Sequence, residues 1–306
     1  MNTTRLKHII KLGRALAHAA MLVYILGVLF ALVTGSPFDL YKIILGYAIV
    51  FTSVLATGYT NNYYDAPIDK YATQTAFSGG SDILVQHPEY RPAIRKIIVF
   101  LYSLSILLGL VFTILFSYSW TFFAFVVLSN VIGWSYTAPP LKLVYRGFGE
   151  LVTMLGASFL LAGAGYYVVT GTIDDLFLLF SLPLLLFGFA VSLYLEIPDR
   201  NADRQGQKMT LIVLTNERIG FILSMISLGL ATLCYVAFSL FHVLGTAANF
   251  LVITVFSVIP FIIGVWSLQK YLRDPTSMMT TVFRATASIF LMWIFLDLYF
   301  VYILLI

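Results

Sequence analysis

The chain has 306 residues, of which 60% are hydrophobic and only 10% are charged. A soluble domain usually carries about 25% charged residues, so this composition excludes an ordinary soluble protein. The single cysteine, Cys234, excludes an intramolecular disulfide and a cysteine-based metal cluster. Apolar runs follow one another from residue 17 to the end without a linker-like stretch. We therefore predict one membrane-embedded domain over residues 1–306.

About nine apolar runs are long enough to cross a bilayer. A spanning helix needs about 20 mainly apolar residues, and the first run is predicted to be a retained helix rather than a removed signal peptide. These predictions give an all-α, polytopic membrane protein whose helices enclose a central cavity. The runs lie near residues 17–34, 41–60, 97–116, 119–135, 149–170, 175–197, 218–241, 248–268 and 283–304.

The basic residues fall almost entirely on one side of this topology. Nine helices place the N-terminus and the even-numbered connections on the same side, which carries every Lys and Arg except Lys42. Because connections rich in Lys and Arg stay in the cytoplasm, we expect this side to face the cytoplasm, with the chain in the plasma membrane. The net charge of +4 thus reflects topology, and no nucleic-acid partner is expected.

An acidic segment follows the second apolar run. Asn61, Asp65 and Asp69 are spaced i, i+4 and i+8, and on a helix this spacing stacks three oxygen-bearing side chains along one face. Pro67 either kinks the helix or ends it before Asp69. The spacing predicts a cluster of oxygen ligands at a helix end.

A second acidic segment follows the sixth run, where Asp199 and Asp203 are again spaced i and i+4. Oxygen ligands without Cys or His favour Mg²⁺ over zinc or copper. Two such sites that face each other would clamp a diphosphate. The alternative is that the acids are solvated at loop ends and pair with Arg200, Arg204 and Lys70. The metal-ligand hypothesis names Asn61, Asp65, Asp69, Asp199 and Asp203.

Basic side chains lie in the same connections and suit phosphate oxygens. Lys142 and Arg146 follow the rigid Pro139–Pro140 pair, Lys208 follows the second acidic segment, and Arg14 begins the first helix. Each could instead be a positive-inside anchor, and Lys142 is the strongest candidate for a ligand contact. The glycines at 79–80 suit a mobile cap, a phosphate nest or a plain turn.

Together these segments resemble the UbiA superfamily of intramembrane prenyltransferases. The second motif of that family, Asp-x-x-x-Asp, is matched by Asp199 and Asp203, and its loop Tyr-x-x-x-Pro-Leu-x-x-x-Gly-x-Gly-Glu resembles residues 136–150. In the first motif, Asn-Asp-x-x-Asp-x-x-x-Asp, Asn62 stands in place of the usual first Asp. In the following Gly-Lys-Arg-Thr-Leu pattern, Gln207 and Met209 depart, whereas the other three positions are kept by Lys208, Thr210 and Leu211.

The resemblance implies Mg²⁺-dependent transfer of a polyprenyl group from its diphosphate to an aromatic, quinone-precursor or lipid-like acceptor. The implied catalytic residues are Asp65, Asp69, Asp199, Asp203 and Lys142. The implied diphosphate contacts are Asn61, Lys142, Arg146, Lys208, Arg14 and Tyr136. Aromatic faces for the allylic cation would come from Tyr136, Tyr145 and Tyr194.

The acceptor and the activity have alternatives at this stage. The motifs are closest in style to MenA-like members, which prenylate 1,4-dihydroxy-2-naphthoate for menaquinone. Other quinone, chlorophyll-type or ether-lipid acceptors are alternatives. Two other functions are a cation transporter and a non-catalytic homologue that binds isoprenoids, the latter suggested by Asn62.

Overall fold

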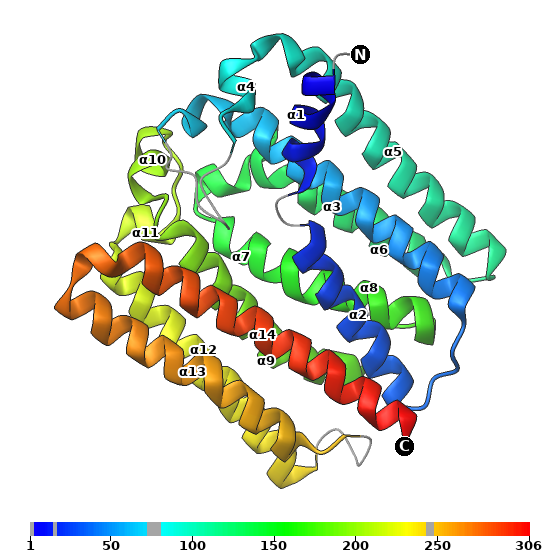
Figure 1. The fold of residues 1–306 in the computed structure, drawn as a ribbon. Helices are drawn as coiled ribbons and strands as arrows, with labels where there is room; N and C mark the ends of the chain where they lie inside the picture. Colours follow the sequence, from blue (N-terminus) through cyan, green and yellow to red (C-terminus); the bar gives the residue numbers. More distant parts are fainter. Residues whose placement is uncertain (1–2, 15–16, 72–80, 243–247) are drawn as a thin grey trace.

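The computed structural model describes residues 3–14, 17–71, 81–242 and 248–306, and all regular secondary structure in these ranges is helical. A continuous helix over Gly149–Thr170 consists of α7 (Gly149–Met154), the π-helical turn η3 (Leu155–Leu160) and α8 (Leu161–Thr170). The other long helices are α2 (Ala17–Val33), α3 (Leu40–Asp69), α5 (Arg91–Leu115), α6 (Trp120–Thr137), α9 (Asp175–Glu196), α12 (Glu217–Phe241), α13 (Phe250–Arg273) and α14 (Met278–Leu305). They form one bundle (Figure 1).

In the described ranges, seven helices are long and apolar enough to cross a membrane. The other two long helices are α2, which has 17 residues, and α6, which has 18 residues and carries polar side chains such as Asn130. All of them lie where the sequence predicts spans. The prediction of an all-α, polytopic membrane protein is therefore confirmed.

Short helices gather at one end of the bundle. Figure 1 shows α1 (Thr3–Arg14), α4 (Ile83–Gln86), α10 (Arg200–Gln205) and α11 (Leu211–Leu214) at this end, opposite the C-terminus. Lys42 lies at the other end, where its ammonium is 5.1 Å from the ring centroid of Tyr118. The remaining short helices are η1 (Pro88–Tyr90), η2 (Leu143–Arg146) and η4 (Pro275–Ser277).

The helix that contains the second predicted span is longer than the apolar run that predicts it. The sequence predicts a span over 41–60, whereas α3 continues through Pro67 to Asp69. Apolar composition marks the part of a helix that lies in the bilayer, and the polar turns after residue 60 extend α3 beyond it. As a result, Asn61, Asp65 and Asp69 lie along one face of a single helix, as their spacing predicts.

The centre of the bundle depends on close contact between α2 and α8. A Cβ atom on Gly27 would lie 1.8 Å from the carbonyl oxygen of Ala162, and one on Gly165 would lie 2.0 Å from that of Tyr24. Only glycine permits this separation, as is common where membrane helices touch. About one turn further along α2, Phe30 stacks on Phe180 of α9 with ring centroids 3.8 Å apart. These contacts hold α2, α8 and α9 together beside the cavity described below.

Candidate active site

The two acidic segments meet on the ammonium group of Lys208. Its Nζ lies 3.1 Å from Asp65 Oδ2 and 3.1 Å from Asp203 Oδ1. Asp65 belongs to α3 and Asp203 to α10, so one cation connects helices that are far apart in the sequence. The fold thus brings one aspartate of each motif together at the end of the bundle that carries the short helices, and the group of Asp65, Asp203 and Lys208 is called the acidic pocket below.

The other two aspartates border this pair. Asp69 accepts a hydrogen bond from the backbone N–H of Ser81 at 3.2 Å, and Asp199 and Lys208 lie within its electrostatic range. In the described ranges no three His, Cys, Asp or Glu side chains are arranged to hold a metal ion. The carboxylate oxygens nevertheless fit a hard divalent cation by their chemistry, and the ammonium of Lys208 lies where such a charge would be stabilised.

Electrostatics explain why Lys208 remains a cation here. Burial lowers the pKa of Lys208, but the Asp65 and Asp203 carboxylates raise it more strongly, so its pKa lies well above the ordinary value. Tyr145 donates its hydroxyl hydrogen to Asp65 Oδ1 at 2.8 Å. Burial and then Asp65 raise the pKa of Tyr145, and the phenol therefore stays a donor. Neither Asp65 nor Asp203 forms its ion pair with Arg200, Arg204 or Lys70.

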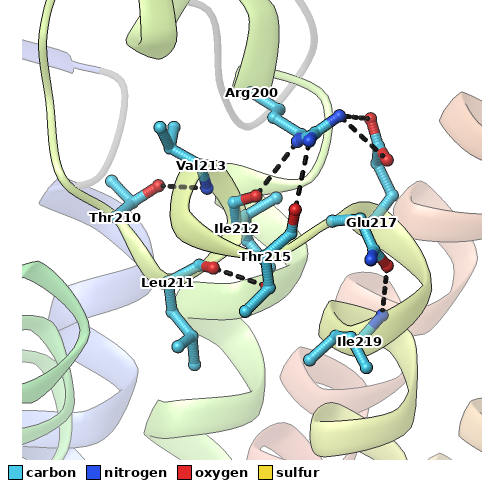
Figure 2. Close-up of polar contacts among 9 residues, drawn as sticks. Arg200, Thr210, Leu211, Ile212, Val213, Thr215, Glu217 and Ile219 are labelled. Carbon is cyan, nitrogen blue, oxygen red and sulfur yellow. Dashed lines mark hydrogen bonds and ion pairs between the residues drawn. The ribbon is translucent and has the colours of Figure 1, made fainter.

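Arg200 fixes the segment that follows α10 (Figure 2). Its Nε and Nη2 donate to the carbonyl oxygens of Ile212 and Thr215 at 3.0 and 3.1 Å. Its Nη1 lies 3.2 Å from Glu217 Oε1. The guanidinium therefore holds the last turn of α11 against the start of α12, as its planar set of donors allows.

The start of α11 is held by two side chains. Thr210 is its N-cap residue and accepts a hydrogen bond from the N–H of Val213 at 3.3 Å (Figure 2). The buried carboxylate of Glu150, at the start of α7, accepts a hydrogen bond from the N–H of Leu211. These contacts give the kept Thr210 and Leu211 of the family pattern a structural role, because they position the segment that carries Lys208.

The two asparagines of the first motif have different contacts. Asn61 Oδ1 accepts a hydrogen bond from the hydroxyl of Thr137 at 3.0 Å. Asn62 Nδ2 donates to the carbonyl oxygens of Leu12 and Gly58 at 3.1 and 2.9 Å. The bond to Leu12 therefore connects α3 to α1, and the bond to Gly58 lies within α3; an Asp carboxylate could donate neither.

The basic residues of the connection between α6 and α7 lie at the surface. Lys142 is exposed, and its ammonium lies 5.5 Å from the ring centroid of Tyr145. Arg146 is also exposed and donates from Nη2 to the carbonyl oxygen of Pro140 at 3.2 Å. Both lie beside Tyr145, but the ion pairs of Asp65 and Asp203 are formed by Lys208. The side chain of Arg14 and the glycines at 79–80 lie outside the described residues.

A cavity of about 300 Å³ begins next to the acidic pocket. Asn61, Tyr136 and Glu196 line it at that end, and deeper parts are lined by mainly apolar residues such as Phe122 and Val168. The π-helical turn η3 also lines it; such turns occur often at functional sites. Tyr194 is fully buried and is not among the lining residues. The volume lies at the lower end of the range for small-molecule sites.

A helical membrane bundle with a carboxylate–lysine pocket above an apolar cavity defines a class: an integral membrane protein that can accommodate an amphiphile with a charged head group. The sequence matches the model of the UbiA prenyltransferase family over residues 20–293. The chain therefore belongs to the UbiA prenyltransferase family, and the resemblance seen in its motifs is confirmed.

Individual relatives agree with this assignment. The 1,4-dihydroxy-2-naphthoate octaprenyltransferase of Bacillus subtilis (strain 168) is 29% identical over 166 residues, which are 54% of this chain and 51% of that protein. The match thus spans about half the length of the relative.

Solved structures share the fold. A UbiA homologue from Archaeoglobus fulgidus bound to GPP and Mg²⁺ is 14% identical, with a TM-score of 0.67 over 95% of this chain and 99% of that one. The apo structure of a UbiA homologue from Aeropyrum pernix K1 is 16% identical, with a TM-score of 0.65 over 89% and 95%. The nearly complete coverage indicates that the bundle is the whole shared fold.

Proposed function

We propose that the chain transfers a polyprenyl group from its diphosphate to an aromatic acceptor in a Mg²⁺-dependent reaction, with 1,4-dihydroxy-2-naphthoate as the leading acceptor. One observation carries the proposal: Asp65 and Asp203, one from each motif, form ion pairs with the same Lys208 ammonium next to an apolar cavity. The Bacillus subtilis relative is a naphthoate prenyltransferase by name, and the Archaeoglobus fulgidus homologue is described with GPP and Mg²⁺. Both support the proposal.

The acidic pocket would hold the diphosphate end of the substrate. Bound Mg²⁺ would neutralise diphosphate oxygens and the charge that develops as the diphosphate leaves. Tyr145 would keep the Asp65 carboxylate in place, and Lys208 would offer its positive charge to a diphosphate oxygen. The proposed metal ligands are Asn61, Asp65, Asp69, Asp199 and Asp203, and the proposed further diphosphate contacts are Lys142, Arg146, Arg14 and Tyr136.

The cavity would hold the prenyl chain and the reacting carbon. Its lining is mainly apolar, so water would be excluded while the bond between prenyl C1 and the diphosphate oxygen breaks. C1 would then bond to a ring carbon of the acceptor, which would lose its proton or, where that carbon bears a carboxylate, CO₂. Because the end of the bundle with the acidic pocket also carries nearly all the basic residues, we place it in the cytoplasm, with the bundle in the plasma membrane.

Purified protein with radiolabelled geranylgeranyl diphosphate, Mg²⁺ and a panel of aromatic acceptors tests this function. Prenylated product should form, EDTA should stop its formation and Mg²⁺ should restore it. Asp65→Asn and Asp199→Asn should each lower turnover by about 100-fold or more. The matched control is Asp175→Asn, at an exposed position at the start of α9 at the opposite end of the bundle, and it should leave turnover unchanged.

Other results would favour the alternatives. Binding of the labelled diphosphate without its release would indicate a non-catalytic isoprenoid-binding homologue. Cation flux in vesicles together with no product would indicate a transporter. Full activity of both Asp variants would remove the metal-clamp mechanism.

A further inference from the structure

A buried carboxylate lies between the acidic pocket and the cavity without a hydrogen-bond donor of its own. Glu196 is the last residue of α9, three residues before Asp199, and it lines the cavity. The residue is 8% exposed, and in the described ranges neither carboxylate oxygen has a hydrogen-bond partner. Burying such a group without a partner is costly, and this indicates that a bound molecule supplies the missing donor.

The groups around Glu196 have other partners. Tyr136 of α6, Glu150 of α7, Asp203 of α10 and Lys208 lie within its electrostatic range. The ammonium of Lys208 is shared between Asp65 and Asp203, and Glu150 already accepts a hydrogen bond from a backbone N–H. Glu150 is close enough to Glu196 for a hydrogen bond between the two carboxyl groups, but such a pair contains a donor only when one of the two carboxyls is protonated. A donor from a bound molecule would satisfy Glu196 without that proton, and Glu196 lies next to the pocket proposed for the diphosphate.

We propose that Glu196 binds the acceptor by accepting a hydrogen bond from a ring hydroxyl of an aromatic molecule. This inference rests on the proposed prenyl transfer and names the group that selects its second substrate. With the diphosphate next to Asp203 and Lys208, a ring held by Glu196 lies beside the bond that breaks. A site built around such a hydrogen bond rejects an analogue that lacks the hydroxyl, because its buried polar group is then left unpaired.

The test compares an acceptor with its methyl ethers in the wild type and in two variants. Turnover of 1,4-dihydroxy-2-naphthoate and of each monomethyl ether is measured with saturating geranylgeranyl diphosphate and Mg²⁺. In the wild type, one methyl ether should be about 100-fold poorer than the free hydroxyl. Glu196→Leu should lower kcat/KM for the hydroxyl acceptor about 100-fold, yet leave KM for the prenyl diphosphate unchanged. The isosteric Glu196→Gln should lose about tenfold.

The decisive readout is discrimination rather than activity. In Glu196→Leu, kcat/KM for the free hydroxyl acceptor and for that methyl ether should become equal, because the hydrogen bond that distinguishes the two acceptors is gone. The control is Glu89→Gln, which removes an exposed carboxylate at the same end of the bundle, and it should keep the wild-type ratio.

Two outcomes would overturn the inference in distinguishable ways. If Glu196→Leu still prefers the hydroxyl, another group orients the acceptor, and Glu196 and Glu150 are a structural pair that shares a proton. If the wild type releases no diphosphate with any aromatic acceptor, the proposed function fails and the role of Glu196 fails with it.

Discussion

Gln207 has a backbone φ of 61°, in the left-handed region that glycine adopts without strain. The UbiA pattern has glycine at this position. We expect Gln207→Gly to raise the free energy of unfolding by about 0.5–1 kcal/mol, because relief of the strain exceeds the extra chain entropy. Chemical unfolding in detergent measures this. Gln205, two residues earlier in α10, is the control, since glycine there should destabilise by about 1 kcal/mol.

At Asn62, unlike at Gln207, restoring the residue of the family motif should lower the stability of the protein. Asn62→Asp restores the usual acid but removes both hydrogen bonds that the amide donates to Leu12 and Gly58. It would also place a carboxylate against two carbonyl oxygens. We expect a loss of about 2 kcal/mol in unfolding free energy and no gain in turnover.

Asn249→Asp is the control for that variant. Asn249 caps α13 through its side-chain oxygen, a bond that Asp keeps, and stability should change little. Higher turnover of Asn62→Asp with intact stability would contradict a structural role for Asn62.

At the scale of residues, periodicity could predict part of the candidate site. The spacing of Asp65 from Asn61 was sufficient to place both on one helix, and the same spacing indicated the turn of helix in which Asp199 is the N-cap and Asp203 lies in α10. The partner of the acids was harder to predict, because Lys142 and Lys208 both lie in basic connections. The choice depends on how the segment after α10 folds, and this is fixed by Arg200 and Glu150, whose contacts cross between elements far apart in the sequence.

At the scale of elements, the contact between α2 and α8 gives a stability prediction. Gly165→Ala places a Cβ atom 2.0 Å from the carbonyl oxygen of Tyr24, and backbone atoms cannot rotate away. We expect a loss of about 3 kcal/mol, at the upper end for overpacking, measured as a lower Tm in detergent. Gly156→Ala, in the π-helical turn η3 of the same continuous helix, meets no atom within 4 Å and should not lower Tm. Equal Tm values for both variants would contradict this account.

The sequence predicts where the long helices lie because apolar length is set by bilayer thickness. Apolar composition alone does not predict that α3 continues to Asp69, since the polar turns after residue 60 carry no apolar signal; only the spacing of Asn61, Asp65 and Asp69 indicates a helix there, and Pro67 leaves its end open. Nor does the sequence predict the π-helical turn η3, whose hydrogen bonding depends on neighbouring helices. The residues that line the cavity could therefore be identified only from the structure, whereas the order of the membrane spans could be predicted from the sequence.

At the scale of the whole molecule, the charge asymmetry predicts a fixed orientation. We expect a cysteine at Arg204, an exposed residue of α10, to react with a membrane-impermeant maleimide in inverted vesicles but not in intact cells. A cysteine at Thr172, exposed between α8 and α9, should react in intact cells. The physical reason is that the loops rich in Lys and Arg remain in the cytoplasm.

Because the chain has a single native cysteine, one substitution removes background labelling from this measurement. Cys234 lies in α12 and is not among the cavity-lining residues, so Cys234→Ala should retain turnover and provide an unlabelled background. Each reporter should also be inaccessible from the side opposite to its own, which controls for leaky vesicles. Labelling of Arg204→Cys in intact cells would place the acidic pocket outside the cell. Prenyl diphosphate and acceptor would then have to reach it from the outer leaflet, and the proposed cytoplasmic reaction would be excluded even if the purified protein were active.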